Sequence, residues 1–554
     1  MSSEPLLPPG ARNQTEVFAV HGADPEVLAY AMAKYSRSAL SMRESLAEIS
    51  RQRAEQFLNT FYFQYGHRSI ADLAHVAMAI ERLSLLAAIV LVDEQRWDGQ
   101  ERSTRYQNFL KSGWYFPDFG EDSGAAQLYS DNITSLFAAY QRTTAAVLEA
   151  LRRRVPCPEA MKPEAYERTL KARAFDVARY LLPLATNTSL GQITNARTLE
   201  TQVSRLLSHP AAEVRDLGAK LREAAIGPAW NVNGHAGAAL VEKIAALELK
   251  SQPEHKLFII ESLAASTEDT SDVTGLAAEA ASLLTRELRS APTLVKYAQP
   301  NDYEIQTRLD LAHAATEILD GLPHAMAPVV DLVERTESLE VELVATLLYS
   351  ASHHPYRQIR DLVAGLPASR VSEIVEIGLR HRGKHDEALR VFHAGAALRF
   401  DILMDIGGFR DMHRHRRCTQ IIQPFTALHG YQTPTSGDLG PDVNILSEAG
   451  VLAEFQSAIG QAHAASARIA ASAASEAAQS ALYLLPLATR IRSLFKMDFA
   501  EAQYIIELRS GPAGHFSYRR VAWEMFLALQ RQHPALARQI RVTDFTQPID
   551  LLQR

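Results

Sequence analysis

The feature that most constrains this chain is a seven-residue segment that occurs twice. Tyr180–Thr186 reads YLLPLAT and recurs letter for letter at Tyr483–Thr489, an offset of 303 residues (483 − 180). The flanks agree: AKYSRS at 33–38 faces LLYSAS at 347–352, and the pattern reaching His209 and Arg215 faces the one reaching His515 and Arg520. Order is kept and the offsets drift slightly, as insertions in loops cause. The sequence therefore predicts a tandem duplication of one domain.

The boundaries follow from the repeat. We place repeat one at 17–245, a connecting segment at 246–334 and repeat two at 335–554. The alanine-rich stretch 451–482 has helical spacing, and the connecting segment contains a helical stretch at 273–288. The apolar runs 87–92 and 397–404 fit either a buried strand or a buried helix. The expected class is a helix-rich α+β fold in two tandem copies.

Composition excludes several classes of protein. The chain has 47% hydrophobic and 22% charged residues, and its formal net charge of −7 gives no basic field for nucleic acid or an anionic membrane. Cys157 and Cys418 lie too far apart for a disulfide framework or a cysteine zinc site. The N-terminus has no apolar stretch, and the longest apolar run, 85–92, is too short to span a bilayer. We expect a cytoplasmic protein without membrane or nucleic-acid partners.

The densest group of chemically competent side chains lies in repeat two. Residues 412–419 read MHRHRRCT, with three arginines and two histidines within five positions. Such charges repel one another unless an anion compensates them, and the planar guanidinium suits phosphate and carboxylate. A solvated basic turn is the alternative, but the apolar approach at 400–408 favours a site. No acidic or cysteine partner stands at ligand spacing from His353-His354 or His413 and His415, so no metal site is expected.

The pattern in the two repeats resembles the flavin-dependent thymidylate synthases, whose signature contains R-H-R-x-x-S followed by S-x-R. Repeat two has the front, Arg414-His415-Arg416 with Thr419 at the serine, and then departs from the signature at three positions: Ile421, Pro424 and Thr426. Repeat one has the back of the signature, namely Glu101, Ser103, Arg105 and Tyr106. Where Arg-His-Arg should stand, repeat one has Asp93, Glu94 and Gln95.

Other marks of the family are divided between the repeats in the same way. Gly66-His67-Arg68-Ser69 resembles the family's G-H-x-S turn, although Leu73 stands where a histidine is usual. Arg179 precedes the shared YLLP as a nucleotide-binding arginine does in the family, whereas repeat two has Leu482 there. Asn195-Ala-Arg197 resembles the flavin-contacting N-x-R, and Leu508-Arg509 resembles the late L-R motif.

The resemblance implies where the site lies. Members of this family are homotetramers whose active sites lie between subunits, so a duplicated chain can build the neighbouring pair within itself as a pseudo-dimer. Each repeat has kept what the other lost, which predicts one composite site per chain and a homodimer that imitates the tetramer. The implied substrate-binding residues are Glu101, Ser103, Arg105, Arg179, Arg414 and Arg509. The implied cofactor-binding residues are His67, Ser69, Asn195, Arg197, Arg414, His415, Arg416 and Arg417.

The implied reaction is reductive methylation of dUMP at C5. Methylenetetrahydrofolate would give the carbon and NADPH the electrons, which FAD would pass on. Ser103 and Arg105 would bind the phosphate, and Arg179 and Arg414, as the catalytic pair, would neutralise negative charge developing on the pyrimidine. The family's route uses hydride from reduced flavin, so Cys418 is not expected to be a nucleophile.

Three alternatives stay open on the sequence. The losses at Ile421 and Leu73 favour a non-catalytic binding or regulatory homologue. Thr419, Ile421 and Pro424 would reshape the pocket for a flavoenzyme that acts on another pyrimidine nucleotide. An alanine-rich helical scaffold unrelated to the family is the third alternative. Flavin content separates the scaffold from the others, and turnover of dUMP separates an enzyme of dUMP from a binding protein.

Overall fold

The computed structural model describes residues 24–34, 68–230, 288–334, 338–383, 389–392, 398–434, 443–472, 476–538 and 540–552. The chain forms two compact units. The first comprises Met1–Val76, Asn195–Arg197 and Ala224–Lys296, and the second comprises Ala77–Thr194, Thr198–Glu223 and Tyr297–Arg554. The second unit therefore contains most of both repeats, and in the described residues the fold is a helix-rich α+β fold.

The first unit is described only in part. Its elements are α1 (Pro25–Lys34) and η2 (Arg68–Leu73). The buried Glu26 ties α1 to a distant segment, because its carboxylate accepts hydrogen bonds from the backbone N–H groups of Thr293 and Leu294 at 2.9 and 2.8 Å. The predicted helix at 273–288 lies almost wholly outside the described residues.

Repeat one contributes a three-stranded sheet to the second unit, in the order β1-β3-β2. Its elements are β1 (His75–Ser84), α4 (Leu85–Leu91), β2 (Asp98–Glu101), α5 (Ser123–Arg154), α6 (Pro163–Ala178), η3 (Arg179–Leu181), β3 (Asn187–Asn195), α7 (Ala196–Leu207) and α8 (Ala212–Ile226). Exposed and buried residues alternate along most of β1, so this strand has one face in the core. Strands β2 and β3 are antiparallel, with Asp98 opposite Ile193.

Repeat two and the connecting segment contribute a four-stranded sheet, in the order β4-β5-β7-β6. The strands are β4 (Val330–Leu332), β5 (Leu398–Asp405), β6 (Thr419–Ile422) and β7 (Arg490–Met497). The helices are α12 (Asp302–Leu319), α13 (Leu339–Ser350), α14 (Tyr356–Ala364), α15 (Ala368–Leu379), η4 (Arg390–Phe392), α16 (Ile406–Met412), α17 (Ile445–Glu448), α18 (Leu452–Ala470), α19 (Ala477–Leu482), α20 (Phe499–Ser510), α21 (Phe516–Gln532) and α22 (Pro534–Ala537). Unlike β1, the central strands β5 and β7 are buried along almost their whole length.

The two sheets repeat the same local design. In each, a strand ends in a capping residue and a seven-residue helix follows: Ser84 caps α4 and Asp405 caps α16 through their side-chain oxygens. The first residue of each helix, Leu85 or Ile406, donates its N–H to the carbonyl of the last heptapeptide residue, Thr186 or Thr489, at 2.9 Å in both copies. The duplication seen in the sequence therefore extends to backbone hydrogen bonds.

The duplicated heptapeptides also pair with each other. Leu184 donates its N–H to the carbonyl of Leu485, and Leu487 donates to the carbonyl of Leu182, both at 2.9 Å. Pro183 and Pro486, which are the same position of the repeat, form an antiparallel bridge at the centre. The hydrogen bond from the first heptapeptide to the second is therefore equivalent to the one from the second to the first.

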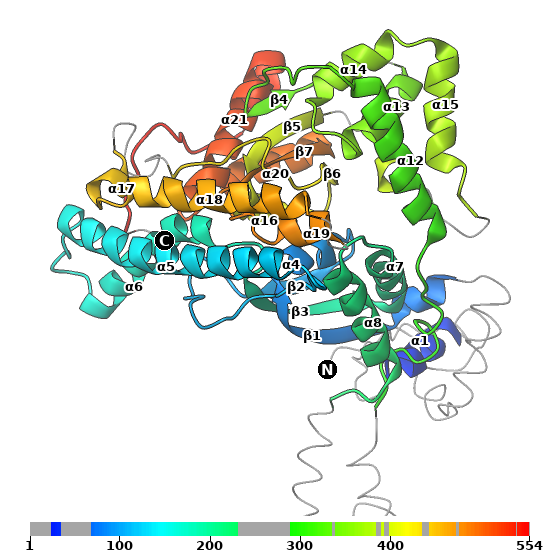
Figure 1. The fold of residues 1–554 in the computed structure, drawn as a ribbon, viewed down its shortest axis with the longest axis horizontal. Helices are drawn as coiled ribbons and strands as arrows, with labels where there is room; N and C mark the ends of the chain where they lie inside the picture. The colour runs from blue at the N-terminus through cyan, green and yellow to red at the C-terminus, as the bar shows by residue number, and fades with distance from the viewer. Residues whose placement is uncertain are drawn as a thin grey trace, which may run out of the picture. The chain divides into compact units, whose positions relative to one another are not determined.

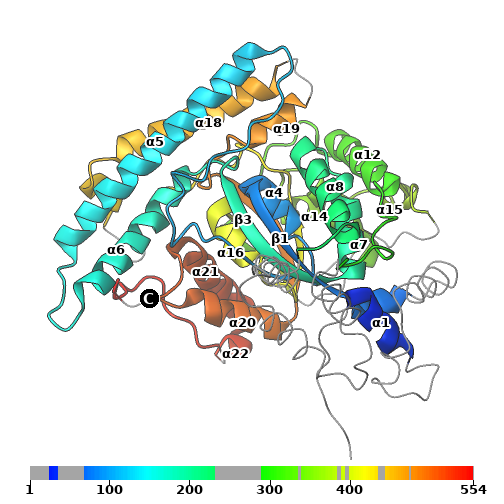
Figure 2. The ribbon, with the colours of Figure 1, turned by 90° about the horizontal axis from the view of Figure 1, so that it is seen from below.

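Two long helices, one from each repeat, lie side by side. Figures 1 and 2 show α5 and α18 packed along each other. Arg154 near the end of α5 is 2.8 Å from Glu448 in α17, and Arg142 pairs with Glu454 in α18. Because these ion pairs are exposed, each contributes at most about 1 kcal/mol, and apolar packing holds the helices together.

The two ambiguous apolar runs form different kinds of secondary structure. Residues 85–91 form a helix, whereas residues 398–405 form a strand. The prediction of helix for 451–482 is confirmed by α18 and α19, which are separate helices and not one.

Candidate functional site

The basic cluster predicted in repeat two follows the short helix α16. Asp405 caps this helix by accepting from the N–H of Gly408 at 2.7 Å, and the chain then turns through 413–418 into β6. His413 and His415 are buried, whereas Arg414 and Arg417 are exposed. Arg414 makes no hydrogen bond or ion pair to any residue that the structure describes, and its guanidinium is therefore available to a ligand.

Arg179 is a buried cation that contacts Asp411 on α16. Its side chain is 2% exposed, and it lies 3.4–3.5 Å from Asp411 Oδ2 and 3.5 Å from Thr104 Oγ1. Charge-assisted hydrogen bonds measure about 2.7–2.9 Å, so these contacts are long. Its Nε has no hydrogen-bond partner among the described residues. A buried guanidinium with unsatisfied donors is costly, and a bound anion would satisfy it.

Asp411 on α16 brings the predicted arginines together. It pairs with Arg179 of the other repeat, and its side chain is 17% exposed. Four positive charges act on it: Arg179, Arg105, Arg414 and Arg509. Burial would raise the pKa of the Asp411 carboxyl, but these four charges outweigh burial and hold its pKa below the ordinary value. Nothing in the sequence marks this carboxylate, although the four arginines that act on it are all among the predicted substrate-binding residues.

His415 and Arg509 form a second fixed pair. Arg509 donates from Nε to His415 Nε2 at 2.8 Å, and His415 Nδ1 faces Glu501 at 3.5 Å. Burial lowers the pKa of His415, and the neutral ring can then accept at Nε2. The guanidinium of Arg509 also lies over the ring of Tyr518, 5.3 Å from its centroid. These contacts fix the position of the Arg509 guanidinium.

Arg105 connects the two repeats. It donates to Asp176 at 2.8 and 3.2 Å, to the hydroxyl of Tyr518 at 2.8 Å and to the carbonyl of Ala513 at 3.2 Å. Four of its N–H donations therefore go to protein acceptors, two of them in repeat two. The predicted phosphate role of Arg105 stays a prediction, and a phosphate would have to replace one of these bonds.

Two further contacts join the predicted residues across the repeats. Glu101 pairs with Arg410, and Arg416 donates to the carbonyl of Trp97 with its guanidinium 4.4 Å from the centroid of that ring. Ser103 accepts from the backbone N–H of Arg105 at 3.2 Å. Arg417 is exposed and lies 3.5 Å from Asp498. The structure thus gathers the signature segments of both repeats within the second unit.

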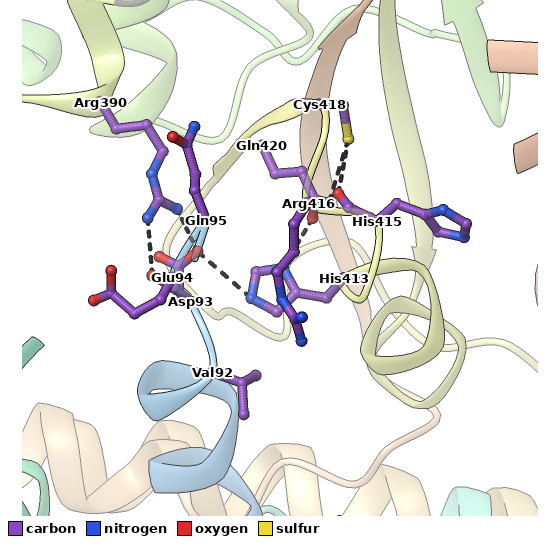
Figure 3. Close-up of a pocket in the computed structure, with 10 residues that line it drawn as sticks. All are labelled: Val92, Asp93, Glu94, Gln95, Arg390, His413, His415, Arg416, Cys418 and Gln420. Atoms are coloured by element: carbon purple, nitrogen blue, oxygen red, sulfur yellow. Dashed lines mark hydrogen bonds and ion pairs between the residues drawn. The ribbon is translucent and has the colours of Figure 1, made fainter. Parts of the chain in front are cut away.

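The equivalent position in repeat one carries acidic residues. Asp93 and Arg414 occupy equivalent positions after the helices α4 and α16. Arg414 follows Asp93 by 321 residues (414 − 93), and the first residues of the two helices are separated by the same number (406 − 85). Figure 3 shows Asp93 paired with Arg390 and facing His413 Nε2 at 3.5 Å, at the edge of a small cavity. Burial raises the pKa of Asp93, but Arg390, His413 and Arg205 outweigh it and lower the pKa to about 2. Repeat one thus has a negatively charged residue, Asp93, at the position of the basic motif. An arginine there would lie beside His413 and repel the basic cluster of repeat two.

A hidden equivalence supports this comparison. Arg205 Nε donates to Glu94 at 2.9 Å, as Arg509 Nε donates to His415 at 2.8 Å, and Glu94 and His415 are equivalent positions (415 − 94 = 321). Arg205 is therefore the counterpart of Arg509 in its contact. No clear equivalent of Leu508-Arg509 is visible in the sequence of repeat one, and the contact with Glu94 reveals it.

The remaining predicted cofactor residues belong to the first unit. Ser69 lies in η2, Asn195 ends β3, and Arg197 lies at the start of α7, 3.4 Å from Asp72. His67 lies outside the described residues.

The two cysteines give a direct test of the environment around the basic cluster. Cys418 is buried, and burial raises the pKa of its thiol to about 12, whereas Cys157 is exposed. Since the thiolate is the reactive form, Cys418 should be inert. We expect one thiol per native chain to react with a disulfide reagent at pH 8, and two after denaturation. Loss of the fast thiol in Cys157→Ser but not in Cys418→Ser would identify it; two fast thiols in the native chain would contradict the burial of Cys418.

Two classes of site find no support in the part of the chain that the structure describes. No group of three or more histidine, cysteine or acidic side chains there is arranged to hold a metal ion. No helix there is long and apolar enough to cross a membrane.

Comparison with known proteins identifies related sequences in both repeats. The family model described as thymidylate synthase complementing protein matches residues 18–227 and 332–535. A UPF0159 protein of Chlamydia muridarum is 26% identical over 94% of this chain and 91% of its own length. A UPF0159 protein of Thermoplasma acidophilum is 24% identical over 93% of this chain and 94% of its own. The solved structure of the flavin-dependent thymidylate synthase ThyX from Helicobacter pylori, complexed with FAD and dUMP, matches 36% of this chain and 89% of that chain, with 18% identity and a TM-score of 0.22.

Proposed function

Since the chain belongs to the family of thymidylate synthase complementing proteins, as a tandem duplication, we propose that it is a flavin-dependent enzyme that methylates C5 of dUMP. The observation that carries the proposal is Arg179. This buried, under-satisfied guanidinium of repeat one faces the basic turn of repeat two across Asp411. We propose one such composite site per chain, made by domains at 17–245 and 335–554 that form a pseudo-dimer around the paired heptapeptides and are joined by 246–334.

In the proposed site each side chain has a role that its surroundings allow. Arg414 is exposed and unpaired within the described residues, and Arg179 is buried with an unsatisfied donor. Both would neutralise negative charge that develops on the pyrimidine when hydride arrives. Ser103, Arg105 and Arg509 would hold the phosphate, with Glu101 completing the nucleotide site. The shift of Arg105 from protein acceptors to phosphate would be part of binding.

The residues around the basic turn fit a flavin nucleotide. Two exposed guanidinium groups, Arg414 and Arg417, could pair with a diphosphate, and Arg416 stands between them in the sequence. Tyr504 and Leu508 are 56% and 50% exposed on α20, and the ring of Tyr504 lies 5.7 Å from the ring of the buried His415. Such an apolar and aromatic surface next to cations suits a planar ring with a charged tail. Bound FAD would supply the hydride chemistry, with NADPH and methylenetetrahydrofolate as co-substrates.

A second candidate is a non-catalytic or divergent homologue that binds a flavin or another pyrimidine nucleotide. The arrangement of Arg105 favours it, because protein acceptors already take the donors that a phosphate would need. Ile421, Pro424 and Thr426 depart from the family signature as well. Turnover of dUMP with methylenetetrahydrofolate and NADPH separates the two candidates.

We expect the purified protein to carry FAD, or to bind it in titration, with absorption bands typical of an oxidised flavin. Chromatography of the released cofactor should give FAD. Arg414→Ala should weaken FAD binding because it removes an unpaired cation from the exposed turn, whereas Arg153→Ala, on the exposed surface of α5, should leave it unchanged. A colourless protein that ignores added FAD would rule out the flavin-dependent enzyme and a flavin-binding homologue, and would leave only a homologue that binds a nucleotide without flavin.

A further inference from the structure

We propose that Tyr518 is a phosphate-binding residue of this chain, and that Arg105 acts on the phosphate through the Tyr518 hydroxyl. The inference rests on the proposed nucleotide site and deepens it: the four hydrogen bonds of Arg105 to the protein stay in place instead of shifting to the ligand, so Arg105 is a positioning residue. Tyr518 belongs to repeat two and lies outside the signature segments, yet Arg105 and Arg509 both contact its side chain.

The hydroxyl of Tyr518 has a hydrogen atom without an acceptor. Arg105 Nη1 donates to the hydroxyl oxygen at 2.8 Å, and because a guanidinium can only donate, the oxygen is the acceptor in this bond. The O–H group itself donates to no residue that the structure describes, and Tyr518 is only 4% exposed. A buried donor that lacks an acceptor is costly, and an anion that accepts from it would remove this cost.

The surroundings of the hydroxyl suit an anion. The guanidinium of Arg509 lies over the ring of Tyr518, 5.3 Å from its centroid, and its Nε donates to His415. Its terminal nitrogens make no hydrogen bond or ion pair with the described residues, and Arg509 is partly exposed, so a ligand can reach it from solvent. Arg105 and Arg509 also both act on the carboxyl of Asp411. The hydroxyl therefore lies within one group of positive charges, beside a guanidinium with free donors.

Arg105 makes the hydroxyl a stronger donor. A guanidinium that donates to a hydroxyl oxygen polarises the O–H bond, and hydrogen bonds in such a chain reinforce one another. Arg105 is itself held by Asp176 at 2.8 and 3.2 Å, and both side chains are buried. A phosphate that accepts from Tyr518 therefore gains from the charge of Arg105 without displacing it from Asp176.

The equivalent positions of the other copy lack both residues. Tyr518 is the third residue of α21, and the third residue of α8 in repeat one is Val214; the two positions and the two helix starts are separated by the same 304 residues (518 − 214 and 516 − 212). Thr426 stands at the equivalent of Arg105. The hydroxyl and the arginine that polarises it are thus both absent from the second copy, as expected if they serve one phosphate.

The test is calorimetric titration of the full chain with inorganic phosphate and with dUMP. Tyr518→Phe removes the hydroxyl and keeps the ring beside Arg509, so both ligands should bind about ten- to a hundredfold more weakly, and by the same factor. The common factor distinguishes loss of a phosphate contact from damage to a pyrimidine contact. Tyr303→Phe, which removes a buried hydroxyl bonded to the carbonyl of Gly378 at 2.8 Å, should change neither affinity.

Unchanged or tighter phosphate binding in folded Tyr518→Phe would overturn the proposal. Tighter binding would mean that the hydroxyl competes with the ligand for Arg105. Failure of Tyr518→Phe to fold would also overturn it, because the hydroxyl would then be a structural requirement.

Arg105→Lys tests whether Arg105 acts through the hydroxyl. Lysine keeps the charge beside Asp176 but lacks the planar fork that also reaches Tyr518, so phosphate binding should weaken in the otherwise unchanged chain. In the Tyr518→Phe background the same change should have no further effect, because the two residues act in series. Additive losses would show that Arg105 contacts the phosphate by itself.

The role of Tyr518 and the proposed reaction can fail separately. A chain that lacks FAD and does not turn over dUMP, but loses phosphate binding with the Tyr518 hydroxyl, refutes the enzyme and supports the phosphate site. A chain that binds FAD and dUMP and is indifferent to Tyr518→Phe supports the proposed function and refutes the role of Tyr518. A chain that binds neither phosphate nor dUMP refutes both.

Discussion

Replacing Arg179 by alanine is expected to abolish measurable dUMP binding. Arg179 is buried in repeat one, its Nε has no hydrogen-bond partner among the described residues, and its guanidinium contacts Asp411, three residues before Arg414 in repeat two. Loss of a buried arginine from a phosphate or pyrimidine contact costs about 2–5 kcal/mol, or roughly 30- to several-thousand-fold in affinity. Calorimetric titration with dUMP in the presence of FAD measures the loss. Arg414→Ala should give a comparable loss although it lies 235 positions away (414 − 179).

Two controls belong to this experiment. Arg153→Ala, on the exposed face of α5, should bind dUMP as the unchanged chain does. Leu482→Arg places an arginine at the equivalent of Arg179 in repeat two, and it should create no second site because Asp93 and Glu94 stand where that site needs Arg-His-Arg. Undiminished dUMP binding in folded Arg179→Ala would show that the composite site lies elsewhere.

Replacing Arg105 by alanine is expected to destabilise the second unit strongly. Arg105 joins Asp176 of its own repeat to Tyr518 and Ala513 of the other, and both members of the ion pair are buried. Removal of one partner of a buried pair costs about 3–5 kcal/mol, because the other charge stays buried and unpaired. Urea unfolding of the full chain, followed by circular dichroism, measures the change.

The double variant Arg105→Ala/Asp176→Ala separates the two roles of Arg105. It should recover part of the lost stability, since no unpaired charge remains. If Arg105 also binds the phosphate, the double variant should still bind dUMP poorly after its stability has recovered. Recovery of both properties would assign Arg105 to the junction of the repeats alone, and an unchanged stability in Arg105→Ala would contradict the structural role.

The sequence predicted the duplication because the evidence for it lies in letters that recur: the heptapeptide, the half motifs and their order. The structure adds that the two heptapeptides form backbone hydrogen bonds with each other, which a comparison of the sequences cannot show. The apolar runs at 87–92 and 397–404 could not be told apart because the described part of each is buried along almost its whole length, so neither shows the period of a strand or a helix.

The acidic residues of the site could not be predicted from the sequence, for a different reason. Asp411 and Asp176 acquire their meaning from arginines more than 70 positions away, and nothing local marks them as partners. The equivalence of Arg205 and Arg509 could not be predicted either, because it is visible only in their hydrogen bonds to Glu94 and His415. An alignment of the C-terminal parts of the two repeats does not show it. Charged motifs were therefore predictable, and the groups that compensate them were not.

The central claim is that one functional site per chain is assembled from residues that each repeat has kept. Calorimetric titration of the FAD-loaded chain with dUMP tests it most directly, because the stoichiometry counts the sites. Arg105, Arg179, Arg414 and Arg509 belong to one site, and their equivalents Thr426, Leu482, Asp93 and Arg205 retain a single arginine, which is paired with Glu94. We therefore expect one dUMP per chain, and two per chain would show that the ion pairs around Asp93 do not close the second site.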